Sequence, residues 1–127
     1  MSSLTKLMES KPILEKELSI YIKNLDFEPK LARIKITLRD GTLLYVRYNN
    51  YNEYSYAIIY SKLELDRVRF DNYDDQWNVV TRPHHYHPRQ SKNGFISPMN
   101  GNHKHDIPEF CNLIKSGKLI LADFRFK

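Results

Sequence analysis

All five histidines of the chain lie between Arg82 and Asp106, in a stretch that reads RPHHYHPRQSKNGFISPMNGNHKHD. They are His84, His85, His87, His103 and His105. Imidazole is the side chain whose ordinary pKa lies nearest neutrality, and it is also a common metal ligand. The stretch is rich in Pro, Gly, Asn and Ser, which favour irregular backbone, and reactive side chains are most often displayed on loops held by a rigid scaffold. We therefore take this histidine stretch as the candidate functional site.

Acid–base catalysis without a metal is the chemistry that these residues favour. A neutral and a charged imidazole together can remove a proton from one oxygen and protonate another near neutral pH. Cleavage of RNA by its own 2′-hydroxyl needs such a pair, and also needs cations that stabilise the extra charge on phosphate. We predict His85 and His105 as the pair, with His84 and His103 in support and Asp71 orienting one ring. The basic residues available to hold phosphate are Arg69, Arg82, Arg89 and Lys104.

A metal site is the second interpretation of the same stretch. The elements H-H-x-H and H-x-H, with Asp71 or Asp106 in reach, offer ligands for a divalent transition metal such as zinc. The ligands would be His85, His87, His103 and His105. The spacing matches none of the common zinc patterns and no cysteine pair accompanies it, so we expect no cofactor and keep the metal-dependent hydrolase as an alternative. A third interpretation leaves the histidines as exposed polar or stacking residues of a loop.

Composition limits the class of protein. A chain of 127 residues fits a single domain, residues 1-127, with one core. The formal net charge of +5 and the pI of about 9.3 favour an anionic partner such as RNA. The lone Cys111 excludes an internal disulfide, and the chain contains neither a signal-peptide pattern nor a run approaching about 20 apolar residues. We expect a cytoplasmic protein with no membrane segment; the composition leaves homodimerisation open.

The elements that must position the histidines come mainly from an alternating sheet pattern. Residues 32–38 and 43–48 alternate between apolar and polar side chains on either side of Asp40-Gly41, which predicts a hairpin with a two-residue type I′ turn. Further strands are predicted at 53–61 and 66–71, and a last strand at 119–126. A packing helix is predicted over about residues 10–25, with Ser10 as its cap.

A short second helix should begin at Asp106, with Glu109 completing a capping box, and should end at Gly117. The predicted fold is therefore α+β: a mostly antiparallel sheet of about five strands packed by an N-terminal helix and a short C-terminal helix. A row of tyrosines, Tyr54, Tyr56 and Tyr60, shares one face of the third strand. We interpret the row as cross-strand packing; a basic, tyrosine-rich sheet that binds nucleic acid or protein without turnover is the alternative function.

The order of short motifs resembles the TumE-type toxin family of prokaryotic toxin–antitoxin pairs. The matching pieces are Asp40-Gly41, Tyr54-Ser55-Tyr56, Arg69-Phe70-Asp71-Asn72, Pro83-His84-His85 and His103-Lys104-His105. The likeness covers about residues 33–115. The resemblance implies a toxin that acts on RNA and is neutralised by a small antitoxin protein. Two departures stand out: ten residues separate Asn72 from Pro83, where the family pattern has almost none, and Asn102 stands where that pattern has a further histidine.

Overall fold

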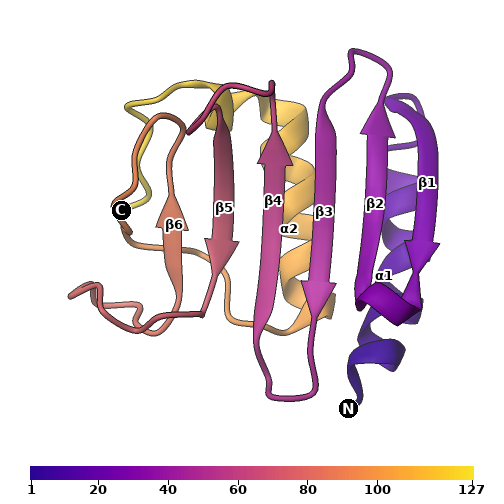
Figure 1. Ribbon diagram of the computed structural model, residues 1–127, viewed down its shortest axis with the longest axis horizontal. Coiled ribbons are helices and arrows are strands. Elements are labelled where there is room, and N and C mark those ends of the chain that lie inside the picture. The colour runs from indigo at the N-terminus through magenta and orange to yellow at the C-terminus, as the bar shows by residue number, and fades with distance from the viewer.

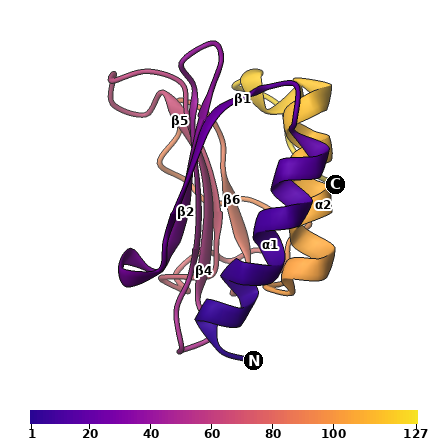
Figure 2. The same cartoon turned by 90° about the vertical axis from the view of Figure 1, so that its right-hand side faces the viewer.

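The computed structural model describes all 127 residues and has two layers, a six-stranded sheet and a pair of helices that cover one of its faces (Figures 1 and 2). Each strand pairs antiparallel with the next in the chain, so the order in the sheet is the order in the sequence. The predicted α+β class is confirmed. The elements are α1 Ser3–Glu17, β1 Ile22–Glu28, β2 Arg33–Leu38, β3 Leu43–Tyr48, β4 Tyr54–Ile59, β5 Arg67–Asp71, β6 His85–His87 and α2 His103–Ser116, with 3₁₀ turns at Pro29–Leu31 and Lys118–Ile120.

The core lies between the sheet and the helices. Tyr56 on β4 is opposite Phe70 on β5, and Phe70 is opposite Tyr86 on β6, so the three rings form one row across the sheet. Phe110 of α2 packs on this row, with its ring 5.7 Å from that of Tyr56 and 6.2 Å from that of Phe70. Burying each such side chain contributes about 1.5–3 kcal/mol, so this row fixes α2 against the sheet. We call this side the helix face.

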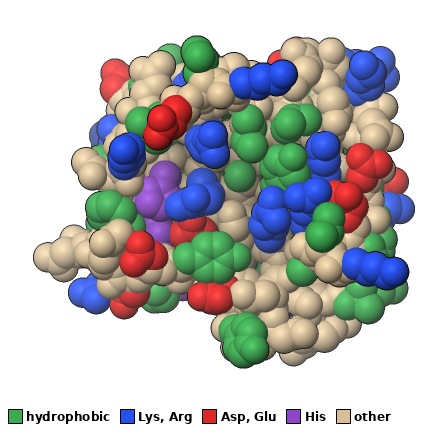
Figure 3. Space-filling view, in the orientation of Figure 1, with side chains coloured by type: hydrophobic (Ala, Val, Ile, Leu, Met, Phe, Trp, Pro, Cys, Tyr) green, Lys and Arg blue, Asp and Glu red, His purple; other side chains and the backbone are tan.

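The other side of the sheet, the open face, is not covered by an α-helix (Figure 2). Because neighbouring residues of a strand point to opposite faces, the residues between those of the core row point here. The Lys and Arg residues on this face are Arg33, Lys35, Arg47, Arg67 and Arg69. Tyr45 lies between two of them, with guanidinium carbons 5.2 Å (Arg33) and 5.1 Å (Arg47) from its ring centre. Figure 3 shows the basic side chains gathered over the middle of this face, with histidine over β6.

The four central strands confirm the alternating pattern, but the first hairpin turns differently from the prediction. Gly41 donates to the carbonyl of Leu38 (3.0 Å), and the amide of Leu38 donates to the carbonyl of Thr42 (2.8 Å). Only Gly41 has a positive φ, +92°, whereas a type I′ turn requires positive φ at both central residues. The loop is therefore a three-residue connection in which glycine alone takes the left-handed position.

The first helix was predicted too late in the chain. It begins after Ser2, whose hydroxyl accepts from the amide of Thr5 (3.1 Å), and Ser10 is a buried residue inside it. The segment Ile22–Glu28, expected to end that helix, is instead β1 and pairs with β2 along its length. The apolar spacing at Leu18, Ile22 and Leu25 fits a helix locally, but the backbone hydrogen bonds offered by β2 decide the outcome.

The histidine stretch is more ordered than predicted. His85–His87 forms β6, a sixth strand, and the H-x-H element is the first turn of α2. Asn102, rather than Asp106, caps that helix by accepting from the amide of Lys104 (3.0 Å). The predicted end at Gly117 is confirmed, with φ +73°.

The last strand, predicted at 119–126, does not form. A 3₁₀ turn and irregular chain take its place, and the alternating phenylalanines are used for packing without strand pairing. The ring of Phe126 lies 5.0 Å from that of Tyr86 and 5.8 Å from that of Phe70. A sheet of six strands results, with β1 and β6 added and the C-terminal strand lost.

Candidate functional site

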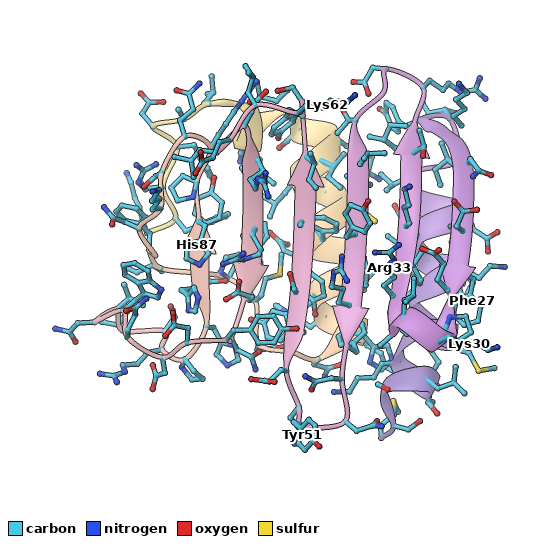
Figure 4. The ribbon with its side chains drawn as sticks, in the orientation of Figure 1. Phe27, Lys30, Arg33, Tyr51, Lys62 and His87 are labelled. Atoms are coloured by element: carbon cyan, nitrogen blue, oxygen red, sulfur yellow. The ribbon has the colours of Figure 1, made fainter.

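A cluster of one carboxylate and two imidazoles lies at the β5–β6 edge of the open face. Asp71 at the end of β5 is directly opposite His85, and Arg69 is directly opposite His87. All four residues belong to the rows that alternate with the Phe70–Tyr86 core row, so they share the open face. Figure 4 views this face and labels His87 on β6.

Both rings of this cluster are oriented by backbone carbonyls. His85 Nδ1 lies 2.9 Å from the carbonyl oxygen of Pro83, and His87 Nδ1 lies 3.2 Å from that of Asn93. A carbonyl oxygen only accepts, so each Nδ1 carries the hydrogen. The Nε2 atoms then face Asp71: that of His85 is 2.5 Å from Oδ1, and that of His87 is 3.9 Å from Oδ2. Arg69 Nε also contacts Oδ2.

The loop before β6 covers this cluster. Trp77 places its ring 5.8 Å from His87 and 6.4 Å from His85, and Gly94 packs so closely against the indole that a Cβ there would lie 2.6 Å from Trp77 Cγ. Asp71 is consequently fully buried and His85 nearly so. Burial, and next the charge of Arg69, lower the pKa of His87, although Asp71 opposes the shift. Asp71 and His85 are thus shielded from water, whereas His87, with 12% of its side chain exposed, forms the edge of the cluster.

A second group of titratable side chains lies at the end of the sheet where α2 begins, on the helix face. His105 Nδ1 donates to Asp106 Oδ1 (2.7 Å), and Tyr56 donates its hydroxyl to Asp106 Oδ2 (2.8 Å). The ring of Tyr56 stacks on that of Tyr54 at 4.8 Å, and the Tyr54 hydroxyl is 2.9 Å from His84 Nδ1. We call these five residues the Asp106 network.

Asp106 is the buried centre of this network. Besides the two side chains, the amides of Asn100 (3.1 Å) and Gly101 (2.8 Å) donate to its carboxylate. Burial raises the pKa of Tyr56 far above its ordinary value, so its hydroxyl keeps its proton and donates. Asp106 thereby holds the start of α2 against the sheet and fixes the orientation of His105.

The two histidines of the network keep one nitrogen free. His84 and His105 each use Nδ1 for a hydrogen bond, and no hydrogen bond occupies Nε2 of either ring. The side chain of His105 is 50% exposed, and His84 is partly exposed. Burial lowers the pKa of His84, and the charges of Asp106 and His85 act in opposite directions on it.

The structure separates some of the predicted site residues. His85 lies on the open face and His105 on the other side of the sheet, so the structure does not bring this predicted pair together; His84 is the histidine that shares a network with His105. His103 is buried, with Nε2 2.7 Å from Glu9 Oε1, and ties α2 to α1. As for metal ligands, the structure gathers His85 and His87 with Asp71, and it places His103 and His105 elsewhere.

The predicted phosphate-binding cations differ in availability. Arg82 is paired with Asp75 (3.1 Å), and Arg89 with Asp66 (2.5 Å). Arg69 contacts Asp71 yet keeps 45% of its side chain exposed. The fourth cation, Lys104, is exposed and lines a polar hollow of about 470 Å³ at the start of α2, together with Lys6 and Asn102. Arg89, whose side chain is 24% exposed, is the least accessible of the four, whereas Lys104, Arg69 and Arg82 (52% exposed) remain within reach of an anion.

Two neighbouring hollows on the open face share Arg67 and Arg69. One, of about 380 Å³, reaches His87, and the other, of about 370 Å³, reaches Tyr45 and Tyr73.

The sequence did not predict three residues of the open-face site: Arg67, Tyr73 and the covering Trp77. The alternation of Arg67 and Arg69 with the apolar residues of β5 is the signal that would have placed both arginines on one face. The sequence interpretation of Tyr54 and Tyr56 as cross-strand packing residues is confirmed by their burial, and the alternative, a free stacking surface for bases, is excluded for these two rings.

No helix of the structure combines the length and the apolar character that crossing a membrane demands. The model of one protein family, described as toxin TumE, matches residues 5–116. No curated protein and no solved structure matches the chain. The family is one of toxins from toxin–antitoxin pairs, so an antitoxin protein is the partner that membership implies. Since the match covers most of the 127 residues, the chain belongs to the TumE toxin family.

Proposed function

We propose that this toxin cleaves RNA in the cytoplasm by metal-independent acid–base catalysis, with His84 and His105 as the proton-transferring pair. The observation that carries the proposal is their common arrangement: each ring fixes Nδ1 on a member of the Asp106 network and leaves Nε2 free. A pair of imidazoles held in this way can serve two different oxygens of one phosphodiester. His84 replaces His85 in the pair that the sequence predicted.

The reaction would follow in one displacement. His84 Nε2 accepts the proton of the 2′-hydroxyl while that oxygen forms a bond to phosphorus. His105 Nε2 gives its proton to the 5′-oxygen as the bond from phosphorus to that oxygen breaks. The products are a 2′,3′-cyclic phosphate and a free 5′-hydroxyl, and the two imidazoles have exchanged protonation states. Asp106 compensates the charge of the His105 imidazolium, as the carboxylate of a catalytic triad does.

Cations around the pair would bind the RNA backbone. Lys104 and Lys6 line the polar hollow at the start of α2 and suit the phosphate under attack. The open-face hollows that share Arg67 and Arg69 suit phosphates further along the strand. The net charge of +5 supports attraction of an anionic polymer over the whole surface.

RNA cleavage by the purified protein tests the proposal, with His105→Asn as the central variant. The Asn amide can still donate to Asp106 from the position of Nδ1, but it cannot take part in proton transfer. We expect a loss of about 100-fold or more in rate, for His84→Asn as well, while cleavage by the wild type persists in EDTA. Lys62→Ala is the matched surface control. Lys62 lies at one end of the sheet, whereas Tyr51 and the start of α2, where His105 is located, lie at the other end (Figures 1 and 4).

Other outcomes would move or remove the catalytic site. Full cleavage by His105→Asn, with loss in Asp71→Asn and in EDTA, would place the chemistry at the open-face cluster and overturn the pair. Cleavage by neither wild type nor variants would favour the second candidate function, a module that binds nucleic acid without turnover. The basic open face with Tyr45 between two arginines favours that candidate, for which affinity should fall steeply with salt.

A further inference from the structure

We propose that Asp71, His85 and His87 form a binding site for one divalent transition-metal ion of the zinc class. The site lies on the open face, on the other side of the sheet from His105, and the inference does not depend on RNA cleavage. One ligand atom from each residue lies within 4.8 Å of the other two. A carboxylate oxygen and two imidazole nitrogens are a common ligand set for this class of metal.

The outer hydrogen bonds of both imidazoles have the form found around metal ligands. Pro83 and Asn93 accept from the Nδ1 atoms of His85 and His87 through their backbone carbonyls. Histidines that bind metals through one nitrogen usually donate the other N–H to a carbonyl or carboxylate, which fixes the tautomer and the direction of the ring. Here both rings are fixed with Nε2 directed toward the same carboxylate.

The buried polar atoms of the cluster lack the hydrogen bonds that their burial demands. Both carboxylate oxygens of Asp71 and Nε2 of His87 are buried without a hydrogen-bond partner. Arg69 and His85 approach the carboxylate closely, but these contacts do not have hydrogen-bond geometry. Buried polar atoms without partners are costly, and electron pairs directed at one point repel each other. A cation between the three side chains would satisfy all of them.

One side of the cluster borders a hollow of the open face. His87 lines the hollow of about 380 Å³ on the open face, so a small molecule can approach its side of the cluster. Arg69 is the one positive side chain in contact with Asp71, and its 45% exposure lets it turn toward solvent when a cation binds. A tetrahedral ion held by these three protein ligands would take its fourth ligand from water or another small molecule, as zinc does in catalytic rather than purely structural sites.

Metal titration of the full-length chain, free of any histidine tag and stripped with EDTA, tests the inference. Trp77, the only tryptophan, has its ring 5.8 Å from that of His87, so Co²⁺ bound at the cluster should quench its fluorescence. Calorimetry with Zn²⁺ should give one ion per chain. In Asp71→Asn, which preserves side-chain shape, and in His87→Gln, we expect affinity at least about 100-fold weaker, because removing a ligand costs more than removing its supporting hydrogen bond.

His105→Ala is the matched histidine control, since His105 is exposed and lies on the other side of the sheet. It should bind Zn²⁺ and quench with Co²⁺ as the wild type does. Circular dichroism of each variant establishes that weaker binding does not come from unfolding. Absence of binding to the folded wild type would overturn the inference. Equal binding by Asp71→Asn and wild type, or binding that disappears in His105→Ala, would overturn it too, because the ion would then occupy a different site.

Discussion

Asp106 links the fold to the proposed chemistry at the scale of single residues. Its carboxylate accepts from Tyr56, from His105 and from two backbone amides that precede α2. A buried carboxylate needs several donors because it has given up its hydration. The same hydrogen bonds that make its burial tolerable also fix the ring of His105, so stability and site geometry share one set of contacts.

Removing the hydroxyl of Tyr56 should therefore destabilise the protein. Tyr56→Phe leaves Asp106 one donor short and also takes away the hydrogen bond between Tyr56 and Tyr48 (2.9 Å). We expect a loss of about 1–3 kcal/mol in the free energy of unfolding, measured with urea. Tyr45→Phe on the open face is the control, because no hydrogen bond involves its hydroxyl, and its effect should be close to zero. Similar losses in both variants would contradict the role of the network.

Cys111 gives a second test at this scale. Burial raises the pKa of its thiol to about 12, so the thiolate that reacts with disulfide reagents is scarce at neutral pH. We expect no reaction with a chromogenic disulfide reagent at pH 7 until urea unfolds the chain. Rapid labelling of the folded protein would mean that α2 opens locally or packs less closely than described.

At the scale of elements, the start of α2 decides where the second histidine motif lies. The helix begins at His103 because Asn102 caps it, so His103, Lys104 and Asp106 all occupy its first turn. A helix beginning at Asp106 would have left the H-x-H element in the preceding loop. With the cap at Asn102, His103 points inward to Glu9 of α1, whereas His105 donates to Asp106 and is half exposed to solvent.

The cap can be tested by changing one side chain. Asn102→Ala should lower stability by about 1 kcal/mol, since the amide of Lys104 loses its acceptor, and Asn102→Asp should retain most of the wild-type stability. Urea unfolding of the three proteins measures the difference. If Asn102→Ala is as stable as the wild type, the helix does not depend on this cap.

At the scale of the whole molecule, an ion pair joins segments distant in the chain. Arg89, after β6, pairs with Asp66, before β5, covers the ring of Tyr60 at 4.4 Å and donates to the carbonyl of Ile120 (3.3 Å). This arginine was predicted from the sequence to hold phosphate. Its contacts instead connect the sheet edge to the C-terminal segment.

The pH dependence of stability should reveal this pair. Arg89, and then Ser61, lower the pKa of Asp66 below its ordinary value of 3.8. A carboxyl with a lowered folded-state pKa stabilises the fold above its ordinary pKa, and the contribution is lost as the pH falls through the folded value. In Asp66→Asn the stability deficit relative to the wild type should be present at neutral pH and should shrink in acid, measured by urea unfolding from about pH 7 to about pH 3. A deficit that stays constant over this range would show that charge is not its cause.

The α+β class, the four central strands and the family could be predicted from the amino-acid sequence, because each rests on local information. Alternation in residues 32–48, the position (though not the type) of the turn at Asp40-Gly41, and the end of α2 at Gly117 need no knowledge of distant contacts. The concentration of histidines between Arg82 and Asp106 also indicated the part of the chain from which both candidate sites take their imidazoles.

Tertiary structure alone decided how those histidines are grouped. Adjacent residues of a strand face opposite ways, so pairing β6 with β5 sends His85 to Asp71 on the open face and leaves His84 with Tyr54 on the helix face. Likewise, Ile22–Glu28 pairs with β2 and joins the sheet although its apolar spacing fits a helix. Phe126 packs against Tyr86 of the core although the C-terminal segment forms no strand. Which strands pair, and therefore which side chains meet across them, depends on the assembled sheet, and no local pattern in the chain contains that information.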